Sequence, residues 1–256
     1  MTEKQLQKKY IDLIKGAASA NGRKETVSYL HKAEKVRTKI LKKLKIHQPK
    51  SITVKNFKES KKALKNIGLP LIVRPSYVLG GKAMEIINEK KDFIKYINKA
   101  LRNSRNFPLL IGSYLKSAIE VDVDAISDGK DVYIIGIMEH IEPCGIHSGD
   151  SNATLPVFSL GDFIIQQIKD HTKKIALALN TVGLINVQFA IKDDKVFVIE
   201  ANPRASRTVP FISKAYKEPY VNYATKIMLG KNKVKDFKFN PSLKGYAIKQ
   251  PVFSFD

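Results

Sequence analysis

Cysteine, tryptophan and long apolar runs are scarce in this chain of 256 residues, which has one cysteine, Cys144, and no tryptophan. A single cysteine excludes an internal disulfide framework and a multi-cysteine zinc site. The longest apolar runs, such as 109–111 and 176–179, are far shorter than the ~20 residues that a membrane-spanning helix needs. The first residues also lack the apolar core of a signal peptide. We therefore expect a cytoplasmic protein without a membrane partner.

Acidic side chains are also few, with 24 against 45 basic ones and a net charge of +21. Residues 1–65 hold 19 basic and 5 acidic side chains, so +14 of that charge lies in this stretch. Such a stretch can bind a polyanion, but nucleic-acid sites favour arginine forks and interleaved aromatic rings. Both are rare between residues 1 and 65. We therefore favour solvated helix faces over a polyanion-binding arm and expect no nucleic-acid partner.

Hydrophobic periodicity predicts a mixture of helices and strands. Helices are expected over 3–18, 25–44, 57–66, 89–102, 160–180, 208–215 and 219–229. Strands are expected over 51–54, 69–74, 83–87, 109–115, 119–126, 132–138, 184–191, 196–201 and 246–250. Within 119–126, Glu120, Asp122 and Asp124 alternate with apolar residues, and 142–158 reads as one long polar loop. Because the order lacks a regular βαβ rhythm, the pattern favours an α+β fold.

Three side-chain oxygen donors, Gln188, Glu200 and Asn202, occur at one end of the predicted hairpin 184–201. Glu200 and Asn202 are two residues apart on a strand and therefore share a face. Hard oxygen donors of this kind suit Mg²⁺ or Mn²⁺. The alternative is that all three are solvated polar residues on the open face of a sheet.

The turn of this hairpin decides whether Gln188 joins the other two. A two-residue turn at 193–194 would pair Gln188 with Ile199 and place Glu200 on the other face. A three-residue loop at 193–195 pairs Gln188 directly with Glu200. That register also gathers an apolar set on the opposite face, namely Val187, Phe189, Ile191, Phe197 and Ile199. The pattern therefore favours the three-residue loop.

Two further features suit phosphate. Arg204 and Arg207 follow the hairpin, and arginines beside a carboxylate metal site suit a polyphosphate; a surface salt-bridge pair is the alternative. Gly80 and Gly81 lie in the loop 76–82, where backbone N–H groups can contact phosphate, although a glycine pair is more often only a turn. The loop does not match GxxxxGK[ST] and no helix follows it, which argues against a P-loop NTPase.

Seven motifs, in order and spacing, resemble the second, C-terminal ATP-grasp half of the carbamoyl-phosphate synthase large subunit. They are LIVRPSYVLGGKAME at 71–85, EVDVDA at 120–125, GIMEHIE at 136–142, GIHSGDS at 145–151, NVQFA at 186–190, IEANPR at 199–204 and RTVPF at 207–211. The resemblance runs from about residue 48 to the C-terminus. No single motif is specific, whereas the combination is.

The resemblance implies an α+β, ATP-grasp fold in which two lobes close on the nucleotide. It divides the chain into a lysine-rich helical segment at 1–47, a first lobe at 48–116 and a second lobe with the metal site at 117–256. The implied activity is that of a ligase that uses ATP to phosphorylate carbamate to carbamoyl phosphate, within a synthase that feeds arginine and pyrimidine biosynthesis. ATP and two Mg²⁺ or Mn²⁺ ions are the implied cofactors. A first ATP-grasp half and a glutaminase small subunit are the implied partners of a split synthase.

The same resemblance implies roles for individual residues. The implied nucleotide-binding residues are Arg74, Gly80, Gly81, Ser113, Leu115, Glu120, Gly145, Ile146, His147, Ser148, Gln188 and Glu200. Within this set, phosphate is expected at Arg74 and the two glycines, adenine at Leu115 and the ribose hydroxyls at Glu120. Gln188, Glu200 and Asn202 are the implied metal ligands. Arg204 and Arg207, with Asn202, are the implied catalytic residues that face the transferred phosphoryl group, whereas Cys144 has no implied role.

The chain also departs from this family, whose large subunit is several times longer. The family has a nucleotide-site arginine on a helix before the Gln-Pro corner, and we assign no equivalent within the corresponding region 33–37. Ser113 and Lys82 replace a larger polar residue and an arginine. Three interpretations stay open: one piece of a split synthase, an inactive remnant, or a repurposed ATP-grasp module that binds nucleotide without synthase activity. A non-enzymatic polyanion binder is a fourth.

Overall fold

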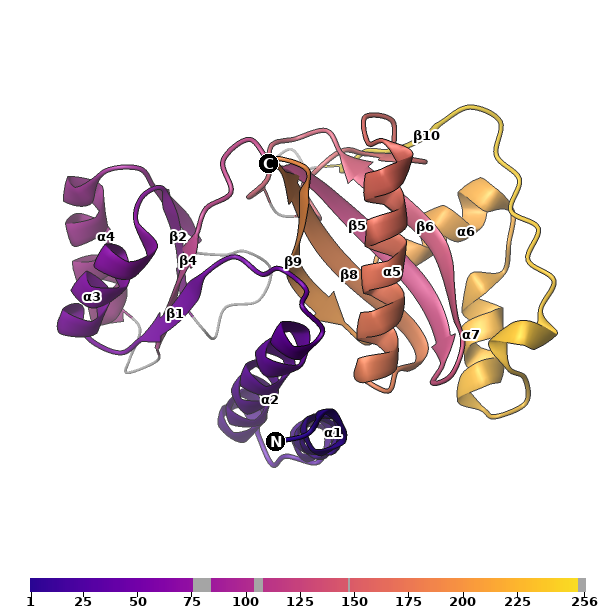
Figure 1. The fold of residues 1–256 in the computed structure, drawn as a ribbon, viewed down its shortest axis with the longest axis horizontal. Helices are drawn as coiled ribbons and strands as arrows, with labels where there is room; N and C mark the ends of the chain where they lie inside the picture. The colour runs from indigo at the N-terminus through magenta and orange to yellow at the C-terminus, as the bar shows by residue number, and fades with distance from the viewer. Residues whose placement is uncertain (76–83, 104–107, 147, 253–256) are drawn as a thin grey trace.

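The chain folds into two lobes, and a pair of N-terminal helices lies beside the larger lobe (Figure 1). The computed structural model describes residues 1–75, 84–103, 108–146 and 148–252. Each lobe combines an antiparallel sheet with helices. The predicted α+β class is therefore confirmed.

The smaller lobe is a four-stranded antiparallel sheet that carries two helices on one face (Figure 1). In spatial order its strands are β1 (Ser51–Val54), β4 (Leu109–Ser113), β2 (Leu71–Pro75) and β3 (Glu85–Ile87). The helices are α3 (Phe57–Ile67) and α4 (Lys90–Asn103). Phe93 and Ile97 of α4 share a buried cluster with Leu71 and Val73 of β2. This cluster holds the strands that carry Arg74 and Ser113.

The larger lobe is a six-stranded antiparallel sheet with helices on both faces. Its strands, in spatial order, are β10 (Ala247–Lys249), β7 (Ala153–Leu155), β6 (Val132–His140), β5 (Ile119–Asp128), β8 (Val182–Lys192) and β9 (Lys195–Asn202). Helix α5 (Asp162–Ala178) covers one face (Figure 1). Helices α6 (Val209–Tyr216) and α7 (Tyr220–Met228) pack on the other, and a 3-10 turn, η1 (Val234–Asp236), follows them.

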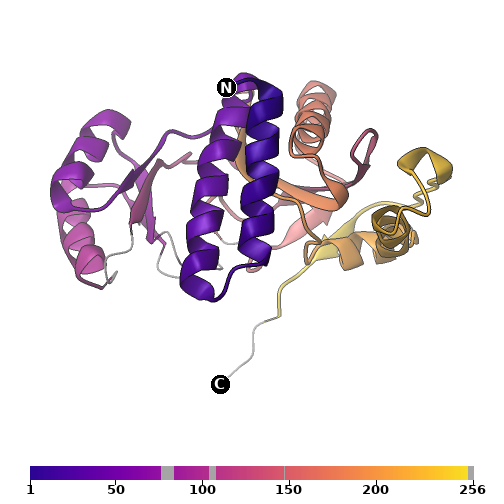
Figure 2. The same ribbon diagram turned by 90° about the horizontal axis from the view of Figure 1, so that it is seen from below.

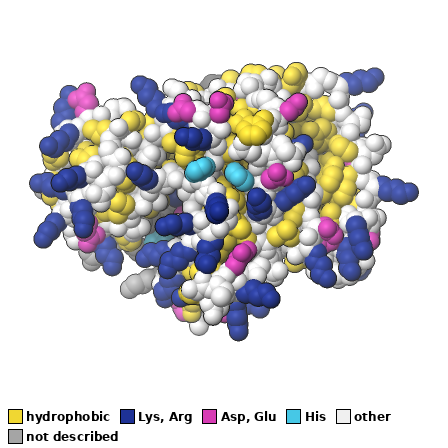
Figure 3. Space-filling view, in the orientation of Figure 1, with side chains coloured by type: hydrophobic (Ala, Val, Ile, Leu, Met, Phe, Trp, Pro, Cys, Tyr) yellow, Lys and Arg dark blue, Asp and Glu magenta, His cyan; other side chains and the backbone are white. Residues whose placement is uncertain are grey.

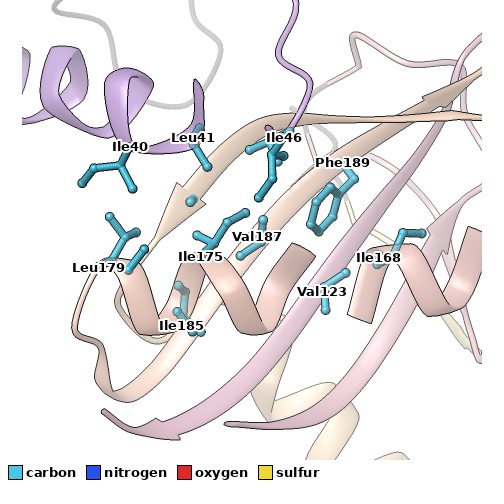
Figure 4. Packing of buried hydrophobic residues seen from close by; sticks show 14 of the residues in the cluster. Ile40, Leu41, Ile46, Val123, Ile168, Ile175, Leu179, Ile185, Val187 and Phe189 are labelled. Atoms are coloured by element: carbon cyan, nitrogen blue, oxygen red, sulfur yellow. The ribbon is translucent and has the colours of Figure 1, made fainter. Parts of the chain in front are cut away.

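Helices α1 (Glu3–Ala18) and α2 (Arg23–Lys43) lie side by side (Figure 2). Their apolar residues belong to the same buried cluster as α5 and the central strands. Figure 4 shows Ile40 and Leu41 of α2 near Leu179, which follows α5, and near Val187 of β8. Leu6 of α1 is also part of this cluster. The lysine-rich helices therefore share a core with the larger lobe.

The stretch 142–158 is not one irregular loop, so that prediction was wrong in part. It contains β7, whose three residues are all buried and which pairs with β6 on one side and β10 on the other. A strand of three residues is too short to show an alternating pattern in the sequence. The strand closes the sheet between β6 and the C-terminal strand.

The turn between β8 and β9 has two residues, so the predicted three-residue loop was wrong. Asp193 and Asp194 have φ values of 49° and 56°, as in the tight hairpin turns whose twist matches that of the strands. A β-bulge near Ile199 then shifts the register, so Gln188 still opposes Glu200. Ile199, expected on the apolar face, is instead 38% exposed, while Val196 and Val198 are buried. The predicted pairing is therefore correct, but for a different reason.

Basic side chains are numerous on the face of the molecule that Figure 3 shows. Figure 3 shows Lys and Arg side chains spread over both lobes rather than gathered at one place. Among the described residues, no helix is long and apolar enough to span a bilayer.

Candidate functional site

A cavity of about 450 Å³ lies between the two lobes. The smaller lobe contributes Arg74 and Ser113 to its lining, and Leu115 lies where the chain passes to the larger lobe. The larger lobe contributes Glu120, Gly145, Ile146, Ser148, Gln188, Glu200, Asn202, Arg204 and Arg207. The other predicted site residues, Gly80, Gly81 and His147, lie outside the described residues. The structure thus gathers around one cavity every predicted site residue that it describes, while their binding roles stay predictions.

Glu120 on β5 is buried beside this cavity and held by donors from two elements. Gln188 Nε2 donates to Glu120 Oε1 at 2.8 Å, and the Gly145 N–H donates to Oε2 at 3.3 Å. Burial raises the pKa of Glu120, and the nearby His140 opposes this shift. A carboxylate oriented in this way keeps further lone pairs for hydroxyl donors. It can therefore receive the hydroxyls of a sugar.

Gly145 adopts a backbone conformation that a side chain would not tolerate. Its φ is +105°, and an added Cβ would lie 3.0 Å from Tyr114 Cε2. The Tyr114 hydroxyl donates to the Cys144 carbonyl at 2.8 Å, which fixes the ring against this loop. The glycine therefore lets the loop approach Tyr114 while its N–H reaches Glu120.

The predicted metal ligands lie together on β8 and β9. Gln188 and Glu200 are cross-strand partners, and Asn202 opposes Asn186 two residues further along. The Gln188 amide nitrogen donates to Glu120, so the amide oxygen of Gln188 is the atom left to bind a metal ion. Within the described ranges, no group of three His, Cys, Asp or Glu side chains could hold a metal ion. A metal here would rely on the Glu200 carboxylate and two amide oxygens, which fits Mg²⁺ completed by phosphate and water.

A row of buried polar side chains runs across the sheet beside the cavity. His140 Nε2 lies 2.9 Å from Asp122 Oδ2. The Asn186 amide nitrogen is 3.3 Å from both Asp122 Oδ1 and Asp124 Oδ1 and donates to each. Burial lowers the pKa of His140, but its hydrogen bond to Asp122 and the charges of Asp122 and Glu120 outweigh burial, so the pKa is raised. The alternation of acidic residues in 119–126 was the sequence signal for this row.

Asp124 is fully buried at the end of the row and contacts the segment that follows β9. Its Oδ1 accepts a hydrogen bond from Ser206 Oγ at 2.6 Å, and its Oδ2 accepts one from Thr208 Oγ1. Burial raises the pKa of Asp124 to about 6, against the lowering effect of these hydrogen bonds. Ser206 and Thr208 flank Arg207, so Asp124 binds the side chains on both sides of that arginine.

Arg37 and Lys249 also line the cavity, and neither was predicted as a site residue from the sequence. Arg37 of α2 donates to the Ala201 carbonyl at 2.9 Å and pairs with Glu34 at 3.2 Å. Lys249 of β10 donates from Nζ to the carbonyls of Ser148 and Ser151, at 3.0 and 2.7 Å. Helical spacing from the buried Ile40 and Leu41 was a signal for Arg37. No local signal marks Lys249, because it reaches the cavity from a three-residue strand.

Cys144 lines the cavity but is not an activated thiol. It is 7% exposed, and burial together with the charge of Glu120 raises its pKa to about 12. A nucleophilic cysteine needs the opposite shift. Its environment therefore gives no support for a nucleophilic role of this thiol.

Residues 34–234 match the protein family described as carbamoyl-phosphate synthase L chain, ATP binding domain. The chain is 51% identical over 218 residues to the carbamoyl phosphate synthase large chain of Archaeoglobus fulgidus, an alignment that covers 84% of this chain and 20% of the relative. It is 48% identical over 214 residues to that of Methanoregula boonei, covering 83% and 20%. The chain therefore spans about a fifth of the length of the curated relatives it matches.

Solved structures of other enzymes share the fold. Biotin carboxylase from Campylobacter jejuni superposes with a TM-score of 0.69 at 16% identity, over 83% of this chain and 49% of that one. N5-carboxyaminoimidazole synthetase from Staphylococcus aureus, complexed with ADP, gives a TM-score of 0.69 at 18% identity, over 84% and 55%. At these identities the similarity shows the fold alone. It confirms the predicted ATP-grasp fold.

Proposed function

Because the chain belongs to the family of the carbamoyl-phosphate synthase L chain ATP-binding domain, we propose that it binds ATP with a divalent metal and phosphorylates carbamate. The observation that supports this most is the cavity between the lobes. There, one carboxylate and two amides from β8 and β9 share a lining with Arg204 and Arg207. Phosphoryl transfer needs such positioning and charge neutralisation more than acid–base catalysis.

In the proposed reaction a carbamate oxygen attacks the γ-phosphorus of ATP. The new P–O bond joins carbamate to the phosphoryl group, the bond from that phosphorus to the β,γ-bridging oxygen breaks, and ADP leaves with the electron pair. Carbamate is already an oxyanion, so no general base is required. Arg204 and Arg207, both exposed to the cavity, would neutralise the charge that spreads over the phosphoryl oxygens.

Glu200, Gln188 and Asn202 are the proposed ligands of two Mg²⁺ or Mn²⁺ ions. Bound there, such ions would neutralise negative charge on the phosphate oxygens of ATP. Glu200 would supply the anionic ligand. The bond from Gln188 Nε2 to Glu120 would keep the amide oxygen directed away from that carboxylate.

The remaining lining residues suit the other parts of the nucleotide. Leu115 and Ile199 supply apolar surface, which we assign to the adenine ring. We assign the ribose hydroxyls to Glu120, because it is an oriented acceptor. Arg74, with the loop that contains Gly80 and Gly81, is assigned to phosphate. Ser113, Gly145, Ile146, His147 and Ser148 complete the proposed nucleotide site.

The whole synthase would need more than this chain, which spans about a fifth of its relatives. We propose that a first ATP-grasp half supplies carbamate and that a glutaminase small subunit supplies nitrogen, in the service of arginine and pyrimidine biosynthesis. The same short span supports one alternative. In it, the chain is an inactive or repurposed module that binds Mg-ATP without transferring phosphate.

The reverse reaction tests this proposal without unstable carbamate. ADP and carbamoyl phosphate with Mg²⁺ should give ATP, slowly, and Arg204→Ala should reduce the rate to background. Acetyl phosphate is the control for specificity, since an equal rate with it would contradict the assignment to carbamate. No ATP formation, alone or with a first-half partner, combined with intact Mg-ATP binding, would favour the binding module.

A further inference from the structure

A buried carboxylate outside the cavity lining contacts the segment that carries a predicted catalytic arginine. Asp124 of β5 is 0% exposed, and it is absent from the lining formed by the described residues. We propose that Asp124 is a positioning residue that holds Arg207 for phosphoryl transfer. This role rests on the proposed function, because it assumes that Arg207 acts on the transferred group.

The contacts of Asp124 bracket Arg207. One carboxylate oxygen accepts from Ser206 Oγ at 2.6 Å, and the other accepts from Thr208 Oγ1. Arg207 itself is exposed to the cavity. Asp124 therefore anchors the two residues on either side of Arg207. Without this anchor, only a surface segment would determine the position of the Arg207 side chain.

Ser206 extends this anchor into the next helix. Its Oγ accepts the backbone N–H groups of Thr208 and Val209, at 3.2 and 3.3 Å, and lies 2.7 Å from Thr208 Oγ1. Helix α6 begins at Val209, and its first turn is closed by the bond from the Ile212 N–H to the Thr208 carbonyl. The orientation of the arginine segment is thus tied to β5 on one side and to α6 on the other.

Asp124 also connects this segment to the proposed metal side. Asn186 Nδ2 donates to Asp124 Oδ1 at 3.3 Å, and Asn186 opposes Asn202 across β8 and β9. One buried carboxylate therefore contacts both the arginine segment and β8, the strand that carries the amide ligand Gln188. A substitution at Asp124 should alter the distance between Arg207 and the proposed metal ligands. Small misplacements of catalytic groups lower the rate strongly.

A carboxylate is the suitable group at this position. Its two oxygens accept from two hydroxyls at once, whereas an amide offers one acceptor oxygen. Asp124→Asn should therefore keep one of the two anchors, and Asp124→Ala should keep neither. The two variants form a graded series at nearly the same fold.

The decisive experiment is a double-mutant cycle on the full chain, with Asp124→Ala, Arg207→Ala and the double variant. Each is assayed for ATP formation from ADP and carbamoyl phosphate. We expect Asp124→Ala to lower kcat by about 100-fold with KM for ADP changed by less than about threefold, and Asp124→Asn to lie between it and wild type. In the Arg207→Ala background, Asp124→Ala should cost less than about threefold more.

The matched control is Ser127→Ala, which removes a buried polar group from the same strand. Ser127 is 0% exposed, and its Oγ accepts the turn N–H of Gly129 at 3.1 Å. It should leave the rate unchanged. If Asp124→Ala does not fold, Asp124→Asn and the isosteric Thr208→Val take its place in the cycle.

The positioning role would be overturned if the fold-loss in kcat of the double variant equalled the product of the two single losses. It would also be overturned if Asp124→Ala folded and kept the kcat of the wild type. If the wild type binds Mg-ATP but forms no ATP, the proposed reaction fails instead. The cycle is then read on Mg-ATP affinity, where non-additive losses support the role of Asp124 and additive losses reject it. If the wild type shows no turnover and no binding of Mg-ATP, both proposals are overturned.

Discussion

Gln188 and Glu200 stand opposite each other on β8 and β9, although only two residues join these strands. A regular hairpin with that turn would pair Gln188 with Ile199. The bulge near Ile199 adds one residue to β9 and returns Glu200 to the face of Gln188. The bulge thus delivers the carboxylate to the cavity and, next to it, one apolar side chain.

Replacing Glu200 with Gln tests the metal site. The substitution keeps the shape and removes the only anionic ligand that we propose, so Mg-ATP affinity should fall by about tenfold or more. Isothermal titration calorimetry with and without Mg²⁺ measures this loss. Asp194→Asn, an exposed carboxylate in the turn of the same hairpin, is the control. Equal affinities in wild type and Glu200→Gln would rule out the site.

Ile199 and Val196 lie on the same strand in opposite environments, which makes them a pair for separating binding from stability. Ile199 is 38% exposed and lines the cavity, while Val196 is 1% exposed in the core and absent from the lining formed by the described residues. Ile199→Ala should weaken Mg-ATP binding by about fivefold, from lost apolar contact. Val196→Ala should lower the free energy of unfolding by about 2 kcal/mol without weakening Mg-ATP binding. Reversal of the two effects in calorimetry and urea unfolding would refute this placement of the two side chains.

Leu6 tests whether α1 is part of the larger lobe. It is 2% exposed within the cluster that includes Val187 and Phe189. Leu6→Ala should lower the free energy of unfolding by about 3 kcal/mol, whereas Lys9→Gln on the exposed face of α1 should change it by less than about 0.5 kcal/mol. Chemical denaturation followed by circular dichroism gives both values. An independent helical appendage would show no loss of global stability with either variant.

Cys144 should react slowly. Because burial raises its pKa to about 12, almost no thiolate is present near neutral pH. Alkylation by iodoacetamide at about pH 8 should proceed at least about 100-fold more slowly in the folded protein than in urea. Mass spectrometry of timed samples measures the ratio. Rapid labelling of the folded chain would mean that the thiol is exposed or activated.

Asp124 should make the free energy of unfolding fall as the pH rises, the opposite of what most carboxylates do. Its pKa is about 6 in the folded protein, above the usual value for Asp, so the folded state binds the proton more tightly than the unfolded state. Its contribution is complete below the unfolded pKa of about 4 and is lost as the pH rises through about 6. His140, whose pKa is also raised, contributes in the same direction at higher pH.

The measurement compares wild type with Asp124→Asn by urea unfolding between about pH 4 and pH 7. The stability of the wild type relative to the variant should fall by about 2 to 3 kcal/mol over that range. A constant difference would mean that Asp124 does not titrate there.

The elements of the fold were largely predictable because most of them carry long periodic patterns. Helix 3–18 and strand 119–126 both show such patterns, and the structure contains α1 and β5 there. The three-residue β7 was not predictable from the same signal. The spacing of the buried residues on β9 does reflect the bulge. Val196 and Val198 are two residues apart, whereas Ala201 follows Val198 after three. A register argument based on a single regular ladder could not use it.

The candidate site was predictable where its residues lie in motifs, and not where they arrive from elsewhere in the chain. Glu120, Gln188 and Arg204 stand in recognisable segments, and all three line the cavity. Lys249 and Arg37 join them only through the pairing of β10 and the packing of α2. Periodicity identifies the apolar face of α2, but it does not say which surface that face will cover.

The core that α1 and α2 share with the larger lobe has a mechanical consequence. The His47 carbonyl accepts the Val198 N–H at 2.9 Å, so the chain stays fixed to β9 until just before it enters β1. Only residues 48–50 and 114–118 then link the smaller lobe covalently to the rest. Any closure of the cavity would therefore have to move the smaller lobe on these two connecting segments while the larger lobe and the N-terminal helices stay together. The length of these segments would then limit how far Arg74 could move toward Glu200.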